Sequence, residues 1–319
     1  MNIVDRQDWI DSRPWLDMDE ADVEGYVTSI SEKVDYDLER KLIEWKERGV
    51  VIFENAVDVG YIESLKSDIN YLREHHQDYE LSAEIRGVQK SIAEFTCADL
   101  NSDGFKFNSI HSISRAAAHL SLTQTAVTFL RHVFKSPAVA LQSLTFYRGS
   151  QQPAHVDYPY VRCQTNLAHL AASWIPLEDI HADSGPLIYY PGSHKLDVSG
   201  FFDWGHGSIV YEPDSTKSPA DFSAYLQQRV KDSGIRPEIF LPKRGDVLIW
   251  HGNLIHQGSE IKNQALTRKS YVTHYTSYES YPPEHRRPNE EGLAENGGFV
   301  FDYPWLNNER RRLPSEALV

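Results

Sequence analysis

The chain has 319 residues with a formal net charge of −14, and its 17 Tyr, 13 Phe and 7 Trp provide enough large apolar side chains for a sizeable core. A strongly acidic surface repels phosphate backbones and anionic lipids, so we expect no nucleic-acid partner and no membrane partner. Only two cysteines occur, Cys97 and Cys163, and the N-terminus lacks the pattern of a signal peptide. These features predict a cytoplasmic protein without a disulfide framework.

The first part of the chain reads as an acidic arm followed by helices. Residues 1–36 are rich in Asp and Glu, and we expect their tryptophans to pack against the domain. The helical support is expected over residues 37–135, although residues 77–115 show no clear period. Three helices are predicted there, at 37–48, at 58–76 and at about 121–134, together with a buried strand at 50–53. Asp37 is the expected N-cap of the first helix and Gly49 its end, and Ser121 is the expected N-cap of the third.

From residue 138 the hydrophobic period becomes that of strands. Strands are predicted at 139–148, 167–176, 187–190, 246–250, 254–256 and 268–276. Residues 195–243 interrupt them as a lid-like insertion with a helix near 220–231, and residues 277–319 form an irregular tail in which Phe299, Phe301, Tyr303, Trp305 and Leu306 are expected packing anchors. Helices followed by many short strands favour a mostly β fold with flanking helices. We therefore expect one domain over 1–319 whose core, residues 138–276, is a double-stranded β-helix, the cupin-like jelly roll.

His155 and Asp157 carry the strongest chemical signal in the chain. They stand two apart in a run that reads as extended, so their side chains project from the same face. A second imidazole, from His251 or His256, would complete the set of two His and one carboxylate that non-haem Fe(II) oxygenases use, with three coordination positions open. A second His-x-Asp, His181 to Asp183, lies in a loop next to Gly and Pro, which favours the first as the site.

Arg268 alternates with Ser270, Val272 and His274, so we expect it to face the interior of its strand. A buried guanidinium needs an anionic partner. The partner is either an internal acid or the carboxylate of a ligand, for which the guanidinium fork is suited. We expect Cys163 to be a small core residue rather than a metal ligand.

Several segments together resemble the phytanoyl-CoA dioxygenase family of Fe(II)/2-oxoglutarate oxygenases, from about residue 38 to residue 276. Their order and spacing carry the resemblance, since each motif alone is weak. The segments are Glu47-Arg48-Gly49-Val50-Val51, His155-Val-Asp157-Tyr-Pro-Tyr160, Trp174 with Ser184-Gly185-Pro186-Leu187, Pro191-Gly192-Ser193-His194, Gly245-Asp246-Val247, and His256 with Ser259 and Arg268.

The resemblance implies iron ligation by His155, Asp157 and His256, because the family spacing to Arg268 selects His256 over His251. His251 is then expected beside the site, where it would orient a ligand through the ligand's other nitrogen. The resemblance also implies that Arg268 holds the distal carboxylate of 2-oxoglutarate. Three further cosubstrate contacts are implied: Ser259, Trp174 and Gln142. Ser259 departs from the family pattern, since it follows the distal His by three residues instead of two, and we expect a one-residue bulge there.

The implied activity is hydroxylation of an aliphatic carbon of a small molecule, with Fe(2+), 2-oxoglutarate and O2, releasing succinate and CO2. Related halogenases lack the carboxylate, so Asp157 argues against halogenation, whereas desaturation, epoxidation and ring formation stay open. Two alternatives differ in kind: a catalytically inactive jelly-roll binding protein, and a zinc hydrolase that uses the same ligands. The complete set of ligands argues against the first, and Arg268 would have no role in the second. The sequence predicts neither the identity of the substrate nor the oligomeric state.

Overall fold

The computed structural model describes residues 4–199, 201–286, 293–301, 303 and 311–314. Its helices are α1 (Arg6–Asp11), α2 (Val23–Ser29), α3 (Leu38–Arg48), α4 (Val59–Glu74), α5 (Arg115–Ser121), α6 (Gln124–Phe134) and α7 (Pro219–Ser233). Its strands are β1 (Val50–Phe53), β2 (Ser82–Ile85), β3 (Val88–Ser91), β4 (Phe105–Asn108), β5 (Ala138–Phe146), β6 (Ala171–Pro176), β7 (Leu187–Tyr189), β8 (Glu238–Phe240), β9 (Val247–His251), β10 (His256–Gly258), β11 (Ser270–Ser277), β12 (Leu293–Glu295) and β13 (Gly298–Val300).

Two sheets form the centre of the molecule. The large sheet has the strand order β1-β9-β6-β11-β5-β4-β2-β3, and the small sheet has the order β10-β7-β8. Between them lies one cluster of buried side chains, to which the large sheet contributes Trp174, Trp250 and Val272 and the small sheet contributes Tyr189 and Phe240. Two antiparallel sheets that enclose an apolar interior form the predicted jelly-roll core.

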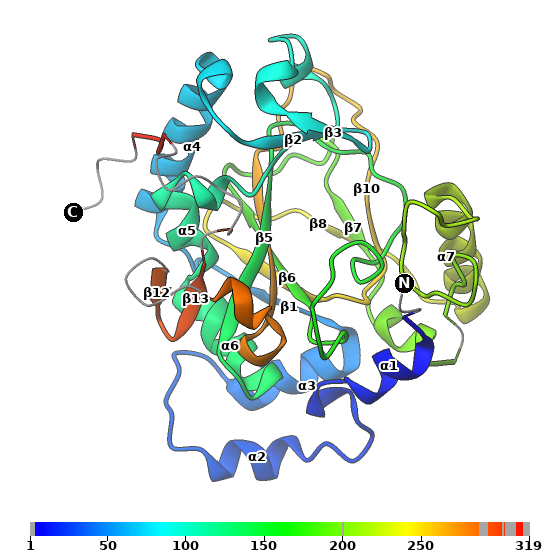
Figure 1. Cartoon of the computed structure of the whole chain (residues 1–319). Coiled ribbons are helices and arrows are strands. Elements are labelled where there is room, and N and C mark those ends of the chain that lie inside the picture. The colour runs from blue at the N-terminus through cyan, green and yellow to red at the C-terminus, as the bar shows by residue number, and fades with distance from the viewer. Residues whose placement is uncertain (1–3, 200, 287–292, 302, 304–310, 315–319) are drawn as a thin grey trace.

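Helices cover the opposite face of the large sheet, where α4 packs against α5 and α6 lies below them in the view of Figure 1. Leu65 of α4, Ala117 of α5 and Phe129 of α6 join the same buried cluster as Tyr271 and Tyr275 of β11. The central strands β6, β9 and β11 of the large sheet are therefore buried on both faces, with helices on one side and the small sheet on the other. No helix in the described part of the chain combines the length and the apolar character needed to cross a bilayer.

The capping signals predicted the first long helix correctly and the third one wrongly. The Asp37 side chain accepts a hydrogen bond from a backbone N–H in the first turn of α3, and Gly49 ends α3 with φ +69°. Ser121 is the last residue of α5 and not the N-cap of the next helix, which begins at Gln124. The reason is packing: the Ser121 hydroxyl is buried and lies 2.7 Å from the Tyr271 hydroxyl.

Six short strands lie where the sequence predicts none. β2, β3 and β4 lie inside the expected helical support, in the segment 77–115 without a clear period, and extend the large sheet beyond β5. β8 lies inside the expected 195–243 insertion and pairs with β7, so this part of the insertion belongs to the jelly roll. In the expected irregular tail, β12 and β13 form an antiparallel pair, and β13 joins β5 in parallel. Phe301 is buried as expected, whereas Trp305 and Leu306 lie outside the described residues. Strands of three residues show too little alternation to be recognised before their partners are known.

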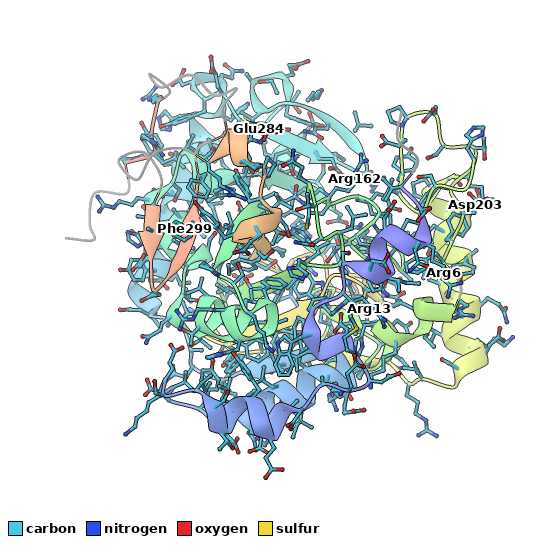
Figure 2. All side chains as sticks on the ribbon, turned by 60° about the horizontal axis from the view of Figure 1, so that its bottom comes forward. Arg6, Arg13, Arg162, Asp203, Glu284 and Phe299 are labelled. Atoms are coloured by element: carbon cyan, nitrogen blue, oxygen red, sulfur yellow. The ribbon has the colours of Figure 1, made fainter. Side chains whose placement is uncertain are left out.

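The N-terminal arm packs against the domain through its aromatic residues, as predicted. Trp9 of α1 is 2% exposed, and its ring centroid lies 6.1 Å from that of Tyr158 and 5.2 Å from that of Phe201. The Ser12 hydroxyl accepts a hydrogen bond from the backbone N–H of Ala168. Arg13, labelled in Figure 2, marks this segment at the surface of the molecule. The arm therefore covers the loop that follows the His-x-Asp segment.

Candidate active site

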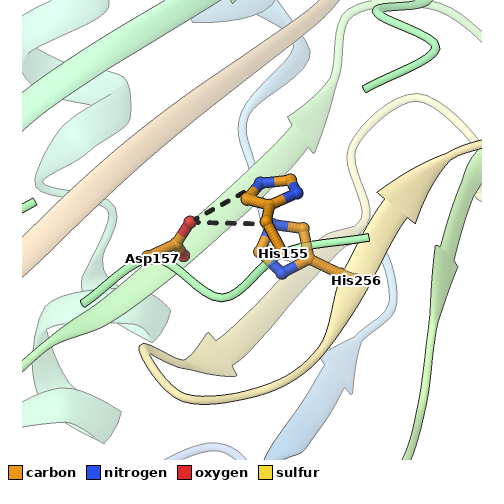
Figure 3. A group of neighbouring side chains, drawn as sticks. All are labelled: His155, Asp157 and His256. Atoms are coloured by element: carbon orange, nitrogen blue, oxygen red, sulfur yellow. Dashed lines mark ion pairs between the residues drawn. The ribbon is translucent and has the colours of Figure 1, made fainter. Parts of the chain in front are cut away.

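His155, Asp157 and His256 come together at one point, with one ligand atom of each lying within 4.8 Å of the others (Figure 3). The expected strand around His155 is reduced to an isolated bridge, in which the backbones of His155 and His256 exchange two hydrogen bonds of 3.0 Å. The backbone N–H of Asp157 donates to the carbonyl of Gly252 at 2.9 Å. Hydrogen bonds from the backbones of His155 and Asp157 to the two ends of the β9–β10 connection thus position the trio. The sequence predicts a full strand around His155, where the structure has only this bridge.

Both imidazoles turn the same nitrogen toward the carboxylate. Nδ1 of His155 lies 2.8 Å from the carbonyl oxygen of Pro153, and Nδ1 of His256 lies 2.9 Å from that of Leu254. Because a carbonyl only accepts, each Nδ1 carries the hydrogen and each Nε2 keeps its lone pair. The two Nε2 atoms lie 3.9 Å and 3.6 Å from Oδ1 of Asp157. This is the tautomer that a cation requires.

The surroundings hold the trio in a form that can bind a cation. Burial and the neighbouring His256 lower the pKa of His155 to about 3, so its imidazole is neutral at physiological pH. Burial acts to raise the pKa of Asp157, but His256 and His274 outweigh it and hold that pKa well below its ordinary value. Metal ligands must be deprotonated to coordinate, and at these two positions they already are. The donor set of two imidazoles and one carboxylate fits Fe(II) with open positions.

The second oxygen of Asp157 has its own partners, which the sequence does not predict. The indole N–H of Trp250 donates to Oδ2 at 2.8 Å, and Nε2 of His274 lies 3.5 Å from the same atom. The His274 ring in turn has its Nδ1 3.3 Å from Nε2 of Gln142, the residue predicted as a cosubstrate contact. The alternation that turns Arg268 inward also includes His274, and this signal could have pointed to it.

Arg268 lies two residues before β11 and points into the interior, as expected. Its side chain is buried, its guanidinium carbon lies 5.4 Å from the ring centroid of Phe146 and 5.7 Å from that of Trp174, and Nη1 donates to the Gly185 carbonyl at 3.3 Å. Its Nε is buried without a hydrogen-bond partner among the described residues, and no described carboxylate forms an ion pair with it. Burial lowers the pKa of Arg268 to about 10, so the group stays charged at neutral pH.

The remaining predicted cosubstrate residues lie around the same interior and differ in how much of their hydrogen-bonding capacity is already used. Trp174 of β6 is buried beside Arg268. The Ser259 hydroxyl donates to the Pro186 carbonyl at 2.7 Å, so its hydrogen is already engaged and only its lone pairs are available. The sequence does not single out Lys106 of β4, whose positive charge acts on His155 and contributes to the low pKa of that residue.

Two competing histidines lie away from the trio. Nε2 of His251 lies 3.0 Å from Oδ2 of Asp17 in the N-terminal arm, and its Nδ1 accepts the backbone N–H of Asn253. The prediction that His251 orients a metal ligand is therefore wrong, because alternation along β9 turns Trp250 toward the site and His251 away from it. His181 and Asp183 have side chains 59% and 46% exposed, as a solvated loop requires. Cys163 is buried, and burial raises its pKa to about 12, which agrees with a core residue.

A model of the family described as phytanoyl-CoA dioxygenase (PhyH) matches residues 45–270. The chain belongs to the phytanoyl-CoA dioxygenase family. The phytanoyl-CoA dioxygenase domain-containing protein 1 of Mus musculus is 22% identical over 182 residues, covering 55% of this chain and 56% of the relative. The protein of the same name from Bos taurus is 25% identical over 167 residues, covering 51% and 49%. The chain thus spans about half the length of the curated relatives that it matches.

Solved structures share the fold of this family member. The non-heme alpha ketoglutarate dependent epimerase SnoN from nogalamycin biosynthesis aligns with a TM-score of 0.55 at 15% identity, covering 83% of this chain and 97% of SnoN. EctD from S. alaskensis, solved with 2-oxoglutarate and 5-hydroxyectoine, aligns with a TM-score of 0.51 at 15% identity, covering 81% and 85%. At this identity the likeness establishes the jelly-roll fold. The predicted cofactors are the ones that these structures contain, since SnoN was also solved with Fe3+ and alpha ketoglutarate.

Proposed function

We propose that this chain is an Fe(II)/2-oxoglutarate-dependent dioxygenase that oxidises a small molecule, with hydroxylation of an aliphatic carbon as the default outcome. The convergence of His155, Asp157 and His256 carries the proposal, because one ligand atom of each lies within 4.8 Å of the others and two of the groups are held deprotonated. Bound at this trio, Fe(II) supplies the activation of O2 coupled to oxidative decarboxylation of 2-oxoglutarate to succinate and CO2.

Arg268 is the proposed partner of the distal carboxylate of 2-oxoglutarate. It is a buried cation with no ion-pair partner among the described residues, and such a charge is costly until an anion reaches it. The guanidinium offers parallel N–H groups that match a carboxylate. Trp174 and Phe146 flank it and restrict the position of the cosubstrate chain, while Gln142 and a lone pair of Ser259 are available as further polar contacts.

No side chain is assigned as a general base in this proposal. The carboxylate and the imidazoles serve as ligands, and the apolar interior formed by residues such as Trp250 and Val272 limits the access of water. The protein positions the metal and the substrate and keeps water out, and the oxidising chemistry belongs to the cofactor.

The direct test is anaerobic titration of the apoprotein with Fe(II) and then with 2-oxoglutarate. Chelation of the metal by the 2-oxo acid produces a charge-transfer band in the visible, and we expect this band to appear only when all components are present. On admission of O2, the protein should form succinate. A protein that shows no band, retains zinc tightly and hydrolyses esters or amides without O2 would instead be the zinc hydrolase, and one that binds small molecules without either activity would be the inactive binding protein.

The two His-x-Asp motifs provide matched variants for this test. Asp157→Ala removes the carboxylate of the trio, and we expect it to abolish iron-dependent succinate formation, as His155→Ala should also do. Asp183→Ala makes the same change at the exposed motif, where we expect wild-type activity. Full turnover by Asp157→Ala would refute the ligand assignment.

The type of oxidation needs its own measurement, because one fold hosts several outcomes. SnoK, a carbocyclase from nogalamycin biosynthesis, aligns with this chain at a TM-score of 0.52, and SnoN is an epimerase. Once a substrate that stimulates succinate formation is found, mass spectrometry with isotopically labelled O2 separates the outcomes. Hydroxylation adds one oxygen atom from O2 to the product, whereas cyclisation, desaturation and epimerisation add none.

A further inference from the structure

The two oxygens of Asp157 lie in different surroundings. Oδ1 faces the metal-binding nitrogens, at 3.9 Å from Nε2 of His155 and 3.6 Å from Nε2 of His256. Oδ2 faces the protein, with the indole nitrogen of Trp250 at 2.8 Å and Nε2 of His274 at 3.5 Å. Asp157, Trp250 and His274 are all buried, so water does not compete for these contacts.

The sheet register places Trp250 at this point. Trp250 of β9 pairs with Ala172 of β6 on one side and with Val50 of β1 on the other. The small Ala172 leaves space on the inner face of the sheet for the indole. Two residues after Trp250, the Gly252 carbonyl accepts the backbone N–H of Asp157 at 2.9 Å, so the carboxylate is held over the indole by its own backbone.

An indole N–H donates but cannot coordinate a metal, so its contact with Oδ2 competes with coordination through that atom. A carboxylate binds a cation with one oxygen or with both. If both oxygens bound, the carboxylate would occupy two positions, and the proposed reaction needs three positions free, two for 2-oxoglutarate and one for O2.

We propose that Trp250 is a positioning residue that engages Oδ2 of Asp157 and so restricts the carboxylate to metal ligation through Oδ1 alone. This inference rests on the proposed function and assigns the control of the open coordination positions to one side chain. His274 is the secondary partner of the same oxygen, since its distance is longer.

The test uses Co(II), which occupies such sites without O2 chemistry, and compares two constants in Trp250→Phe and the wild type. One is the affinity of the apoprotein for Co(II), and the other is the affinity of the Co(II)-loaded protein for 2-oxoglutarate, both followed through the visible Co(II) bands. Phe keeps an aromatic ring, smaller than the indole, and removes the N–H. Because the freed Oδ2 would compete for a coordination position that 2-oxoglutarate needs, we expect 2-oxoglutarate affinity to fall about tenfold or more, the order of change that altered groups around metal ligands produce. Co(II) affinity should change much less, because the freed Oδ2 becomes an additional ligand.

Trp45→Phe is the matched control. Trp45 is also fully buried, but its indole N–H has no hydrogen-bond partner among the described residues. We expect both constants to stay at their wild-type values in this variant. If Trp250→Phe lowers Co(II) affinity and 2-oxoglutarate affinity together, or changes neither, Trp250 only supports the fold and the proposal is overturned.

A second measurement applies if Trp250→Phe does not fold. In the wild type, the assigned indole 1H–15N resonance of Trp250 should be shifted downfield and should stay so when Zn(II) is added, because the bond to Oδ2 persists in the loaded site. Loss of the downfield shift on loading would mean that the metal takes both oxygens, which contradicts the proposal. A wild-type protein that binds neither Co(II) nor 2-oxoglutarate would instead sink the proposed function.

Discussion

At the scale of single residues, a substitution at Arg268 distinguishes a role in binding 2-oxoglutarate from a role in stabilising the fold. Arg268→Met keeps an unbranched apolar stem, which reaches about as far as Nε of the arginine, and removes the charge. Loss of a charge-assisted contact of about 1.5–3 kcal/mol should weaken 2-oxoglutarate binding by roughly ten- to a hundredfold. The unfolding free energy of the apoprotein should stay unchanged or rise, because an uncompensated buried charge is removed.

Titration calorimetry and urea unfolding measure the two effects on the same samples. An internal ion pair at Arg268 would give the opposite pattern, a loss of roughly 3–5 kcal/mol of stability in the apoprotein. Lys269→Met is the control, because Lys269 is the adjacent cation and lies 3.5 Å from Glu178 at a partly exposed position. It should leave 2-oxoglutarate affinity unchanged.

The sequence predicts residues that act through their own chemistry better than residues that act through a neighbour. Residue type and spacing indicate His155 and Asp157, the family resemblance selects His256 over His251, and the structure brings the three together. The partners of the carboxylate were missed, because the bond from Trp250 to Asp157 joins residues 93 positions apart. Such a contact depends on the register of β9 against the loop, which no local pattern records.

At the scale of elements, the N-terminal arm supports the loop that carries the metal ligands. Trp9 packs on Tyr158, and the backbone N–H of Ile209 donates to the carbonyl of Val4. Trp9→Ala should lower the unfolding free energy by about 3–5 kcal/mol, as truncations of large buried side chains do. If the arm supports the loop locally, hydrogen exchange should accelerate most at the amides of Ala168 and Ile209.

Native-state hydrogen exchange measured by mass spectrometry checks this prediction. Trp15→Ala is the matched variant, because Trp15 lies in the same arm but donates to the His132 carbonyl on α6, away from the loop. It should leave exchange at Ala168 and Ile209 close to wild type. Equal acceleration throughout the chain in Trp9→Ala would show that the arm has no local role.

Elements with local signals were predictable, and elements defined by distant partners were not. α3 and α4 follow from their apolar period and their Asp caps, which act within a few residues. β2, β3 and β4 have four residues each and obtain their hydrogen bonds only by extending the large sheet beyond β5. Their segment has no apolar period, because β3 has no buried residue and β2 has only one, Ala83.

At the scale of the whole molecule, the order of the elements predicted the architecture. The helical periodicity found up to residue 135, outside the strand at 50–53 and the segment 77–115, corresponds to the helical layer, and the strand periodicity after it corresponds to the jelly roll. The pairing of strands within the large sheet was not predictable, since β1 comes from the helical half of the sequence and pairs with β9 of the other half. The two halves of the sequence pair because the large sheet needs strands from both to enclose the apolar interior.

The ionisable groups buried across the molecule predict that it loses stability in acid. Burial lowers the pKa of His194 to about 3 from an ordinary value of 6.5, and His155 behaves alike. Burial alone would raise the pKa of Asp17, but its ion pair with His251 lowers it. In each case the unfolded chain binds a proton that the folded chain does not. The unfolding free energy therefore rises with pH, for the histidines between about 3 and 6.5 and for the aspartates below their ordinary values near 3.8.

His194→Gln isolates one of these contributions at a position outside the metal trio. Between pH 7 and pH 5, a group whose pKa falls from 6.5 to about 3 on folding accounts for about 2 kcal/mol of lost stability. The variant should therefore lose about 2 kcal/mol less than the wild type over this interval in urea unfolding. His181→Gln, at an exposed loop, should keep the wild-type dependence on pH. Parallel pH profiles for His194→Gln and the wild type would mean that folding does not lower the pKa of His194, against the effect of its burial between the Lys46 carbonyl and the His251 ring.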